Sequence, residues 1–393
     1  MTASPAELIF QSSARALTAP WLAERRARAN EVFEREGVPN RRIEDWKYTD
    51  LKQALEAANG IAPGRVEFAV AGLPSGAELV DFARLAEAPD WVRQHLGKSA
   101  AAQSIPAASL AFGESGFALR IPKGLKAKEP VSVQFSGGSG HARALIVLED
   151  RAELAVEETP STARFSNLGV EIVVGPGSRM TLLRFADAAP DSIQLEDIAV
   201  RVARDGEFRA HLVNGGAAPA RLNLRLTLRE PGASALLSGA SVLGGHAHAD
   251  VTTEIYHASG ETRSVQLFKK VIGGTARGVY QGKITVAQGA NGSDSRQTAK
   301  ALLLENGAEA DLKPELEILA DDVKCAHGAA VGDLDTEALF YLRSRGVPES
   351  EARNLLVRAF LEDALLLIED ERLRAKAWAK VERAVASQTG AVA

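Results

Sequence analysis

The chain has 393 residues, a formal net charge of −5 and a single cysteine. This length suffices for a large core or for two to three structural units, and the mild acidity argues against a protein that binds nucleic acid through a basic surface. A single cysteine excludes an internal disulfide and favours a reducing cytoplasm. We expect neither a secretory signal nor a membrane helix, because no apolar run approaches the ~20 residues that a membrane span needs.

Residues 1–116 are expected to form an N-terminal region of helical and mixed character. Apolar residues recur with a helical period until Gly37 and Pro39 interrupt the pattern. The next segment, RRIEDWKYTDL, places Trp46 among charged residues, and we interpret it as a packed tryptophan with ion-paired neighbours. A short helix capped by Thr49 or Asp50 is expected to follow.

Residues 117–320 are predicted to form a β-helix. Turn-then-strand units begin near residues 150, 177, 206, 232, 260 and 289, which are 27, 29, 26, 28 and 29 residues apart. A repeat of this length, built from strands without intervening helices, indicates a solenoid. Alternation places one face of each strand inside, as for Leu222 and Leu224. A β-sandwich, with turns about every 8–12 residues, remains the alternative.

Residues 321–393 are predicted to form a C-terminal helical domain. Asp333 or Asp335 is placed to cap a first helix that ends at Gly346, and Pro348 opens a second helix. The second helix carries an apolar stripe with helical spacing. The stripe consists of Ala352, Leu355, Leu356, Ala359, Phe360 and Ala364.

Motifs for common enzyme chemistry are absent from the sequence. It contains no GxxxxGK[ST] phosphate-binding loop, no glycine fingerprint that leads from a strand into a helix, and no G-x-S-x-G elbow. His246, His248 and Asp250 share a strand face and form a hypothetical metal site. Two histidines alone do not complete a zinc site, which usually has three or four protein ligands, so Asp250 is the candidate for the third. We favour polar side chains on the outer wall of a coil, where Asp250 and Glu254 face water.

Cys325 and His327 are the strongest candidates for a functional site. Side chains at positions i and i+2 of a strand point the same way, so the thiol and the imidazole would share a face. Both are suitable ligands for iron or zinc. A chain with one cysteine cannot alone hold an ordinary cysteine-ligated iron–sulfur cluster. Any such site therefore needs a partner or persulfide-type chemistry.

Three segments carry the motifs of a known family. They are RRIEDWKYTDL, the segment GSDSRQTAKALLL at 292–304, and the long block at 311–363 that contains CAHG. Together they resemble the N-terminal motif, the end of the core and the C-terminal region of the SufB/SufD family of iron–sulfur cluster assembly proteins. The form C-x-H-G, the short chain and the lack of further cysteines are similar to the SufD branch.

The resemblance implies a right-handed parallel β-helix core flanked by helical regions. It implies pairing with a SufB-type subunit through the β-helices, with His327 at that interface as a ligand of the nascent cluster and Cys325 as an accessory group. It also implies that a SufC-type ATPase docks on the C-terminal helices. The docking residues expected there are Phe340, Tyr341, Leu355, Leu356 and Phe360.

The leading hypothesis is therefore a non-catalytic scaffold subunit of the SUF system, with ATPase activity in a partner. The isolated chain is expected to hold no cofactor stably, because a transient cluster and a reduced flavin belong to the complex; a homodimer is an option when partners are absent. Two alternatives remain. One is a carbohydrate-active β-helix enzyme that uses carboxylates such as Asp294 and Glu305, and the other is a self-contained metal protein built on His246, His248 and Asp250.

Overall fold

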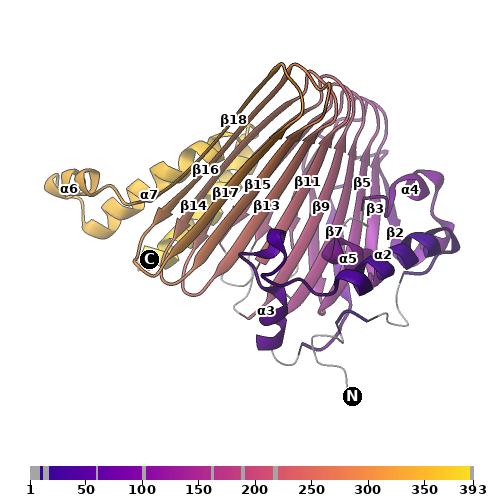
Figure 1. The fold of residues 1–393 in the computed structure, drawn as a ribbon, viewed down its shortest axis with the longest axis horizontal. Coiled ribbons are helices and arrows are strands. Elements are labelled where there is room, and N and C mark those ends of the chain that lie inside the picture. The colour runs from indigo at the N-terminus through magenta and orange to yellow at the C-terminus, as the bar shows by residue number, and fades with distance from the viewer. Residues whose placement is uncertain are drawn as a thin grey trace.

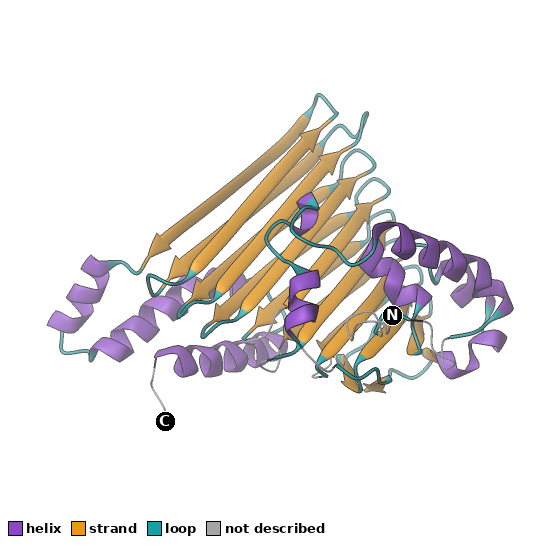
Figure 2. Ribbon diagram, turned by 60° about the horizontal axis from the view of Figure 1, so that its bottom comes forward, coloured by secondary structure: helices purple, strands orange, loops and turns teal. Residues whose placement is uncertain are grey.

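The computed structural model describes residues 9–11, 17–58, 61–99, 103–160, 163–186, 191–215 and 220–389. Its centre is a parallel β-helix in which each coil contributes one strand to each of two nine-stranded sheets. Figures 1 and 2 show the strands stacked in two layers, with helices outside both layers. The predicted β-helix is thus confirmed, and the β-sandwich alternative is wrong because neighbouring strands within the stack are parallel.

The first sheet ends at β18 and is called the β18 sheet below. Its strands, in spatial order, are β1 (Val66–Ala71), β4 (Val131–Gly137), β6 (Glu153–Thr159), β8 (Arg179–Ala186), β10 (Glu207–Asn214), β12 (Ser234–Leu243), β14 (Arg263–Ile272), β16 (Ser293–Leu303) and β18 (Val323–Asp333).

The second sheet ends at β17 and is called the β17 sheet. Its strands, in spatial order, are β17 (Glu309–Ile318), β15 (Arg277–Val286), β13 (His248–His257), β11 (Ala220–Leu228), β9 (Ile193–Val202), β7 (Phe165–Val174), β5 (Gly140–Leu148), β3 (Ser115–Ile121) and β2 (Glu78–Asp81). At the opposite end of the stack, β1 and β2 pair antiparallel with β4 and β3.

One corner of each coil turns through a residue in the left-handed region. Gly177 and Gly232 have φ of 62° and 78°, and Arg151, Asp205 and Glu261 have φ of 55°, 53° and 56°. Glycine adopts this conformation without steric cost, whereas other residues do so rarely. The regular turn spacing in the sequence therefore reflects a backbone requirement that recurs once per coil.

The interior of the β-helix is the largest apolar core. It contains inward-facing residues of both sheets, including Met180, Leu182 and the β11 residues Leu222 and Leu224 that the alternation predicted to face inward. Because each coil buries its inner face only against its neighbours, the core becomes continuous through stacking.

Helices cover the outer faces of both sheets. The N-terminal helices pack on the first coils of the β17 sheet, and the C-terminal helices pack on the β18 sheet. The N-terminal elements are η1 (Pro20–Leu22), α2 (Ala23–Glu36), η2 (Glu44–Trp46), α3 (Leu51–Ala57), η3 (Phe82–Glu87), α4 (Asp90–His95) and α5 (Ser104–Ala111); the C-terminal ones are α6 (Thr336–Ser344), α7 (Glu349–Leu366) and α8 (Glu371–Thr389). None of the helices in the described part of the chain is long and apolar enough to cross a membrane.

Several sequence predictions in the C-terminal region can be compared with this structure. Asp335 caps α6 by accepting hydrogen bonds from the backbone N–H groups of Glu337 and Ala338, as one of the two predicted caps. The strands continue past residue 320, so the helical domain expected from 321 begins only after β18. Cys325 and His327 alternate there with Ala and Gly, which gives a weak strand signal.

The predicted apolar stripe of α7 is wrong in part. Ala352 and Ala364 are buried as expected, but Leu355 is 43% exposed. The buried face instead continues through Val357, Leu361 and Leu365 onto the β18 sheet. The stripe drawn from the sequence was rotated relative to the face that packs, because α7 carries apolar residues on more than one side.

Candidate functional site at the open end of the β-helix

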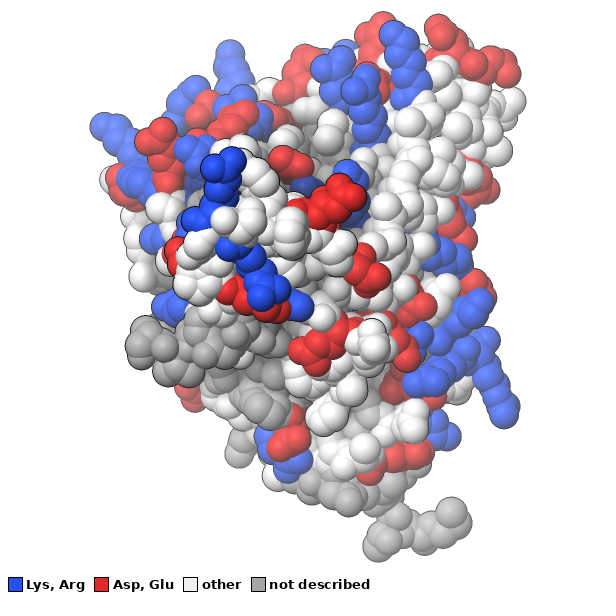
Figure 3. Space-filling model, turned by 90° about the vertical axis from the view of Figure 1, so that its left-hand side faces the viewer, with Lys and Arg blue, Asp and Glu red and all other residues white. Residues whose placement is uncertain are grey.

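The C-terminal end of the β-helix is an uncovered edge of both sheets. β17 and β18 each have a neighbouring strand on one side only, and most of their residues are exposed or half-buried. Leu319 and Val331 are 58% and 50% exposed there. Figure 3 looks at this end of the molecule, where charged side chains of both signs surround uncharged surface. An edge with free backbone donors and acceptors is a template for another strand.

Cys325 and His327 lie on β18 and face the interior side of the stack. In the parallel register Cys325 is next to Ser295 and His327 is next to Gln297, and both neighbours on β16 are buried. Cys325 is half-buried against the main core, whereas His327 is exposed. The predicted pair is therefore placed together at the end of the interior column, where no further coil of this chain covers it.

Two polar ladders lead from the interior to this pair. On β14 and β16, Ser264 and Ser295 are register partners with hydroxyl oxygens 2.6 Å apart, and the next rung is Cys325. The second ladder runs from Gln266 through Gln297 to His327. The three rungs read S-V-Q, S-R-Q and C-A-H in the sequence, at spacings of 31 and 30 residues.

Gln297 is held in one orientation by a buried tyrosine. Its Nε2 donates to the hydroxyl of Tyr280 at 2.8 Å, and that hydroxyl donates to Oε1 of Gln266 at 3.2 Å. The Oε1 atom of Gln297 is buried without a protein partner, in the rung directly below His327. A buried unpaired acceptor is costly, so the inner wall of the site offers an unused oxygen beside the histidine.

The Cys325 thiol is not activated within this chain. Partial burial raises its pKa, the backbone N–H of Ser295 opposes the shift, and the nearby Asp294 carboxylate adds to it. A thiol of raised pKa is a weaker nucleophile and ligand than a thiolate.

The site is incomplete within one chain. Among the described residues, no group of three or more His, Cys, Asp or Glu side chains is placed to hold a metal ion. Two protein donors are fewer than the three or four protein ligands that zinc sites usually have. Within the described residues, Cys325 and His327 therefore form a pair without a third ligand of these types.

The hypothetical metal site at His246, His248 and Asp250 is wrong. The Asp250 carboxylate is buried, paired with Arg221 at 2.7 Å and hydrogen-bonded to the Thr49 hydroxyl at 2.6 Å. The Thr49 hydroxyl lies 2.8 Å from Nε2 of His248, while His246 contacts Thr275 in a turn. The expectation that Asp250 faces water failed because the N-terminal segment covers this part of the β17 sheet.

That covering segment is the EDWKYTD motif. Trp46 is buried, and the guanidinium carbon of Arg221 lies 4.1 Å from its ring centroid. Glu44 pairs with Lys313 of β17 at 2.7 Å, and the backbone carbonyl of Asp45 accepts from Gln281. The packed tryptophan with ion-paired neighbours is confirmed, and the motif joins the N-terminal region to the coils nearest the open end.

The carboxylates of the carbohydrate-enzyme alternative lie far apart. Asp294 is near the start of β16 and Glu305 follows its end. At ~3.3 Å per strand residue, the separation is about 35 Å, whereas glycosidase carboxylates lie ~5–10 Å apart. This pair therefore cannot act on one glycosidic bond.

The predicted ATPase-docking residues fall into two sets. Phe340 and Tyr341 on α6 are 73% and 58% exposed, and Leu355 on α7 is 43% exposed. Leu356 and Phe360 instead line a groove between α7 and the ends of β16 and β18. The Phe360 ring also faces the Lys269 ammonium, 5.0 Å from its centroid, so it is less available to a partner.

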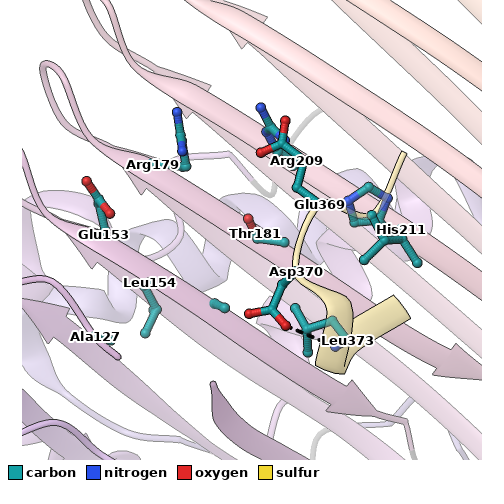
Figure 4. A pocket seen from close by; sticks show the side chains of 12 residues that line it. Ala127, Glu153, Leu154, Arg179, Thr181, Arg209, His211, Glu369, Asp370 and Leu373 are labelled. Atoms are coloured by element: carbon teal, nitrogen blue, oxygen red, sulfur yellow. Dashed lines mark hydrogen bonds and ion pairs between the residues drawn. The ribbon is translucent and has the colours of Figure 1, made fainter. Parts of the chain in front are cut away.

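A further pocket lies under the turn between α7 and α8, against the outer face of the β18 sheet. Figure 4 shows Arg209 beside Glu369, with Arg179 and Asp370 at other points of the lining. Arg209 pairs with Glu207 and with Glu369, both at 2.6 Å, so these charges are already neutralised. The residues that line the pocket do not include Cys325 or His327.

The structure defines a parallel β-helix protein with an uncovered strand edge at one end and helices on the outer faces of both sheets. Residues 132–360 match the family described as SUF system FeS cluster assembly, SufBD core domain, and residues 7–72 match the SufBD protein N-terminal region. The core match covers more than half of the chain, which therefore belongs to the SufBD family of iron–sulfur cluster assembly proteins.

Individual relatives agree with this assignment. An iron–sulfur cluster assembly SufBD family protein of Synechocystis is 28% identical over 380 residues, covering 84% of this chain and 83% of the relative. The iron–sulfur cluster assembly protein SufD of Escherichia coli is 28% identical over 377 residues, covering 88% and 89%. A SufBD family protein of Mycobacterium leprae is 26% identical over 362 residues, covering 88% and 90%.

Proposed function

We propose that this chain is a SufD-type, non-catalytic scaffold subunit of a cytoplasmic SUF complex. The observation that carries the proposal is the open end of the β-helix, where Cys325 and His327 terminate the interior ladders without a third ligand. A SufB-type subunit that adds its own strands to β17 and β18 would cover this end and supply the missing donors. The nascent cluster is then the cargo of the interface, and a reduced flavin, if used, belongs to the complex.

His327 is proposed as the ligand that this chain contributes, with Cys325 as an accessory group. The test is His327→Ala in cells that depend on the SUF system, with the exposed His246→Ala as the matched control. We expect cluster maturation to fall at least tenfold with His327→Ala while the complex still purifies intact. Normal maturation would refute the site, and failure of the complex to assemble would show that His327 is structural.

The exposed surface of α6 is proposed to dock a SufC-type ATPase. Phe340 and Tyr341 project from a helix that contacts α7 and contributes no residue to the buried cores of the described chain. Large aromatic side chains of this kind supply most of the energy at many interfaces. The double variant Phe340→Ala/Tyr341→Ala is expected to weaken capture of the ATPase at least tenfold. The control Leu366→Ala, at an exposed apolar residue of α7, should leave capture unchanged. Equal capture by both variants would contradict the proposed surface.

A further inference from the structure

The outer face of the β17 sheet carries a ladder of alternating charge that leads to the open end. Along one row of register partners the residues are Arg225 on β11, Glu254 on β13, Lys283 on β15 and Glu315 on β17. Directly opposed side chains on neighbouring strands interact, and opposite charges stabilise the pairing. The row therefore ends, at the last strand, on a carboxylate whose next neighbour is missing.

The whole outward face of β17 is acidic. Its outward positions are Glu309, Asp311, Lys313, Glu315 and Glu317, so four of the five are carboxylates. The side chains of Glu309, Glu315 and Glu317 are 66%, 47% and 48% exposed.

The bases within reach are too few for these acids. Arg277 serves both Asp311 at 2.7 Å and Glu309 at 3.5 Å. Lys283 bonds Glu317 at 2.7 Å. Lys313 is shared between Glu315 at 3.1 Å and Glu44 at 2.7 Å. Three bases thus face five carboxylates, and the surplus negative charge lies along the edge that a new strand would join.

A second copy of this chain fits that edge poorly. Two identical strands related by a two-fold axis must run antiparallel. In the register of full overlap the axis passes through Lys313, which places Glu309 opposite Glu317, Asp311 opposite Glu315, and Lys313 opposite its own copy. Every directly opposed outward pair then carries like charges, which destabilises strand pairing.

We propose that β17 selects a strand from a different chain that presents Lys or Arg side chains on this outer face, and that the same charges oppose self-pairing in full register. The inference rests on the proposed function, since it specifies the chemistry of the subunit that covers the open end. Pro314, in the middle of β17, removes one backbone donor and is a residue typical of edge strands.

The test is the full-length variant Glu315→Lys/Glu317→Lys. In the fully overlapped self-pair this change converts each carboxylate–carboxylate contact into an opposite-charge contact. Sedimentation of the chain alone should show self-association at least tenfold tighter than in the unmodified protein at about 0.05 M salt. The difference should disappear near 1 M salt, where the Debye length falls to ~3 Å. A co-expressed SufB-type subunit should bind the variant at least tenfold more weakly.

Two further variants control for net charge and for folding. Glu31→Lys/Glu34→Lys makes the same charge change on the exposed face of α2 and should leave both measurements unchanged. Glu315→Gln/Glu317→Gln should give intermediate values without placing a lysine beside Lys283 or Lys313. Circular dichroism verifies the fold of each variant.

The outcomes separate this inference from the proposed function. If the lysine variant self-associates no more tightly than the α2 control, the role of the β17 charges is refuted, whatever any partner does. If it self-associates but binds the SufB-type subunit normally, the selection of a basic strand is refuted. If the unmodified chain binds no such subunit, the proposed function fails, while the self-association measurement still decides the charge effect.

Discussion

The substitution Gly282→Ala tests the interior wall on which His327 rests. A Cβ atom built at Gly282 would lie 1.7 Å from Nε2 of Gln297 and 2.6 Å from the Tyr280 hydroxyl oxygen. Neither distance is compatible with contact between atoms, so Gln297 must leave its bond to Tyr280. The rung next to His327 is thereby displaced by a change that does not touch the histidine itself.

The size of the effect follows from the groups that are disturbed. Overpacking of a filled core by one methyl group costs about 1–3 kcal/mol, and loss of the hydrogen bond between two buried partners adds about 1 kcal/mol. Alanine has fewer conformations than glycine in the unfolded chain, which offsets about 0.5–1 kcal/mol of this destabilisation. We therefore expect the free energy of unfolding to fall by about 1–3.5 kcal/mol.

Urea unfolding followed by circular dichroism measures this loss. Gly328→Ala is the matched control, because it lies in the same stack and nothing is within 4 Å of its added Cβ; its effect should be within about 0.5 kcal/mol. If Gly282→Ala were as mild as this control, the buried network of Tyr280, Gln266 and Gln297 would not be the rigid support that the structure indicates.

Two other perturbations test the covering elements. Burial lowers the pKa of His141 from 6.5 to about 4, opposed by its bond to the Ile9 carbonyl, so the native state stays neutral while the unfolded chain takes up a proton. The unfolding free energy should therefore fall as the pH drops from about 6.5 to about 4, and this group contributes up to about 3 kcal/mol of that fall. Urea unfolding at several pH values should show a smaller fall for His141→Gln. If the unfolding free energy of His141→Gln changed with pH as steeply as that of the unmodified protein, burial of His141 would not be the cause. Trp46→Ala should lower the free energy of unfolding by about 3 kcal/mol and speed amide exchange in α3. Ile43→Ala, at a 40% exposed position, is the control and should lower it by less than about 1 kcal/mol. Equal losses in the two variants would mean that Trp46 does not anchor the segment.

The β-helix and the candidate pair were predictable for a local reason. Each coil repeats a corner that needs left-handed backbone and an inner face that alternates with the outer one, so both leave a regular mark in the sequence. Cys325 and His327 are two residues apart on one strand, and strand geometry alone puts them on one face. The ladder beneath them was also visible, as the repeated S-x-Q, S-x-Q and C-x-H, but without a register the three tripeptides had no reason to be compared.

The outer surfaces were not predictable in the same way. The sequence of β13 gives Asp250 a polar, outward position, which is correct, yet it says nothing about the segment around Trp46 that buries it some 200 residues away in the chain. The sequence of α7 likewise contains the residues that pack and the residues that stay exposed, and only the position of the β18 sheet distinguishes them.

The sequence by itself determined the repeat, its inward face, the helix caps and the pairing of one thiol with one imidazole, because each depends on interactions within a few residues. Only the tertiary structure decided that this pair ends an interior column, that Gln297 lies beneath His327, and that surplus carboxylates line the edge at β17. These features depend on which strands become neighbours, and that is fixed by the stacking of whole coils.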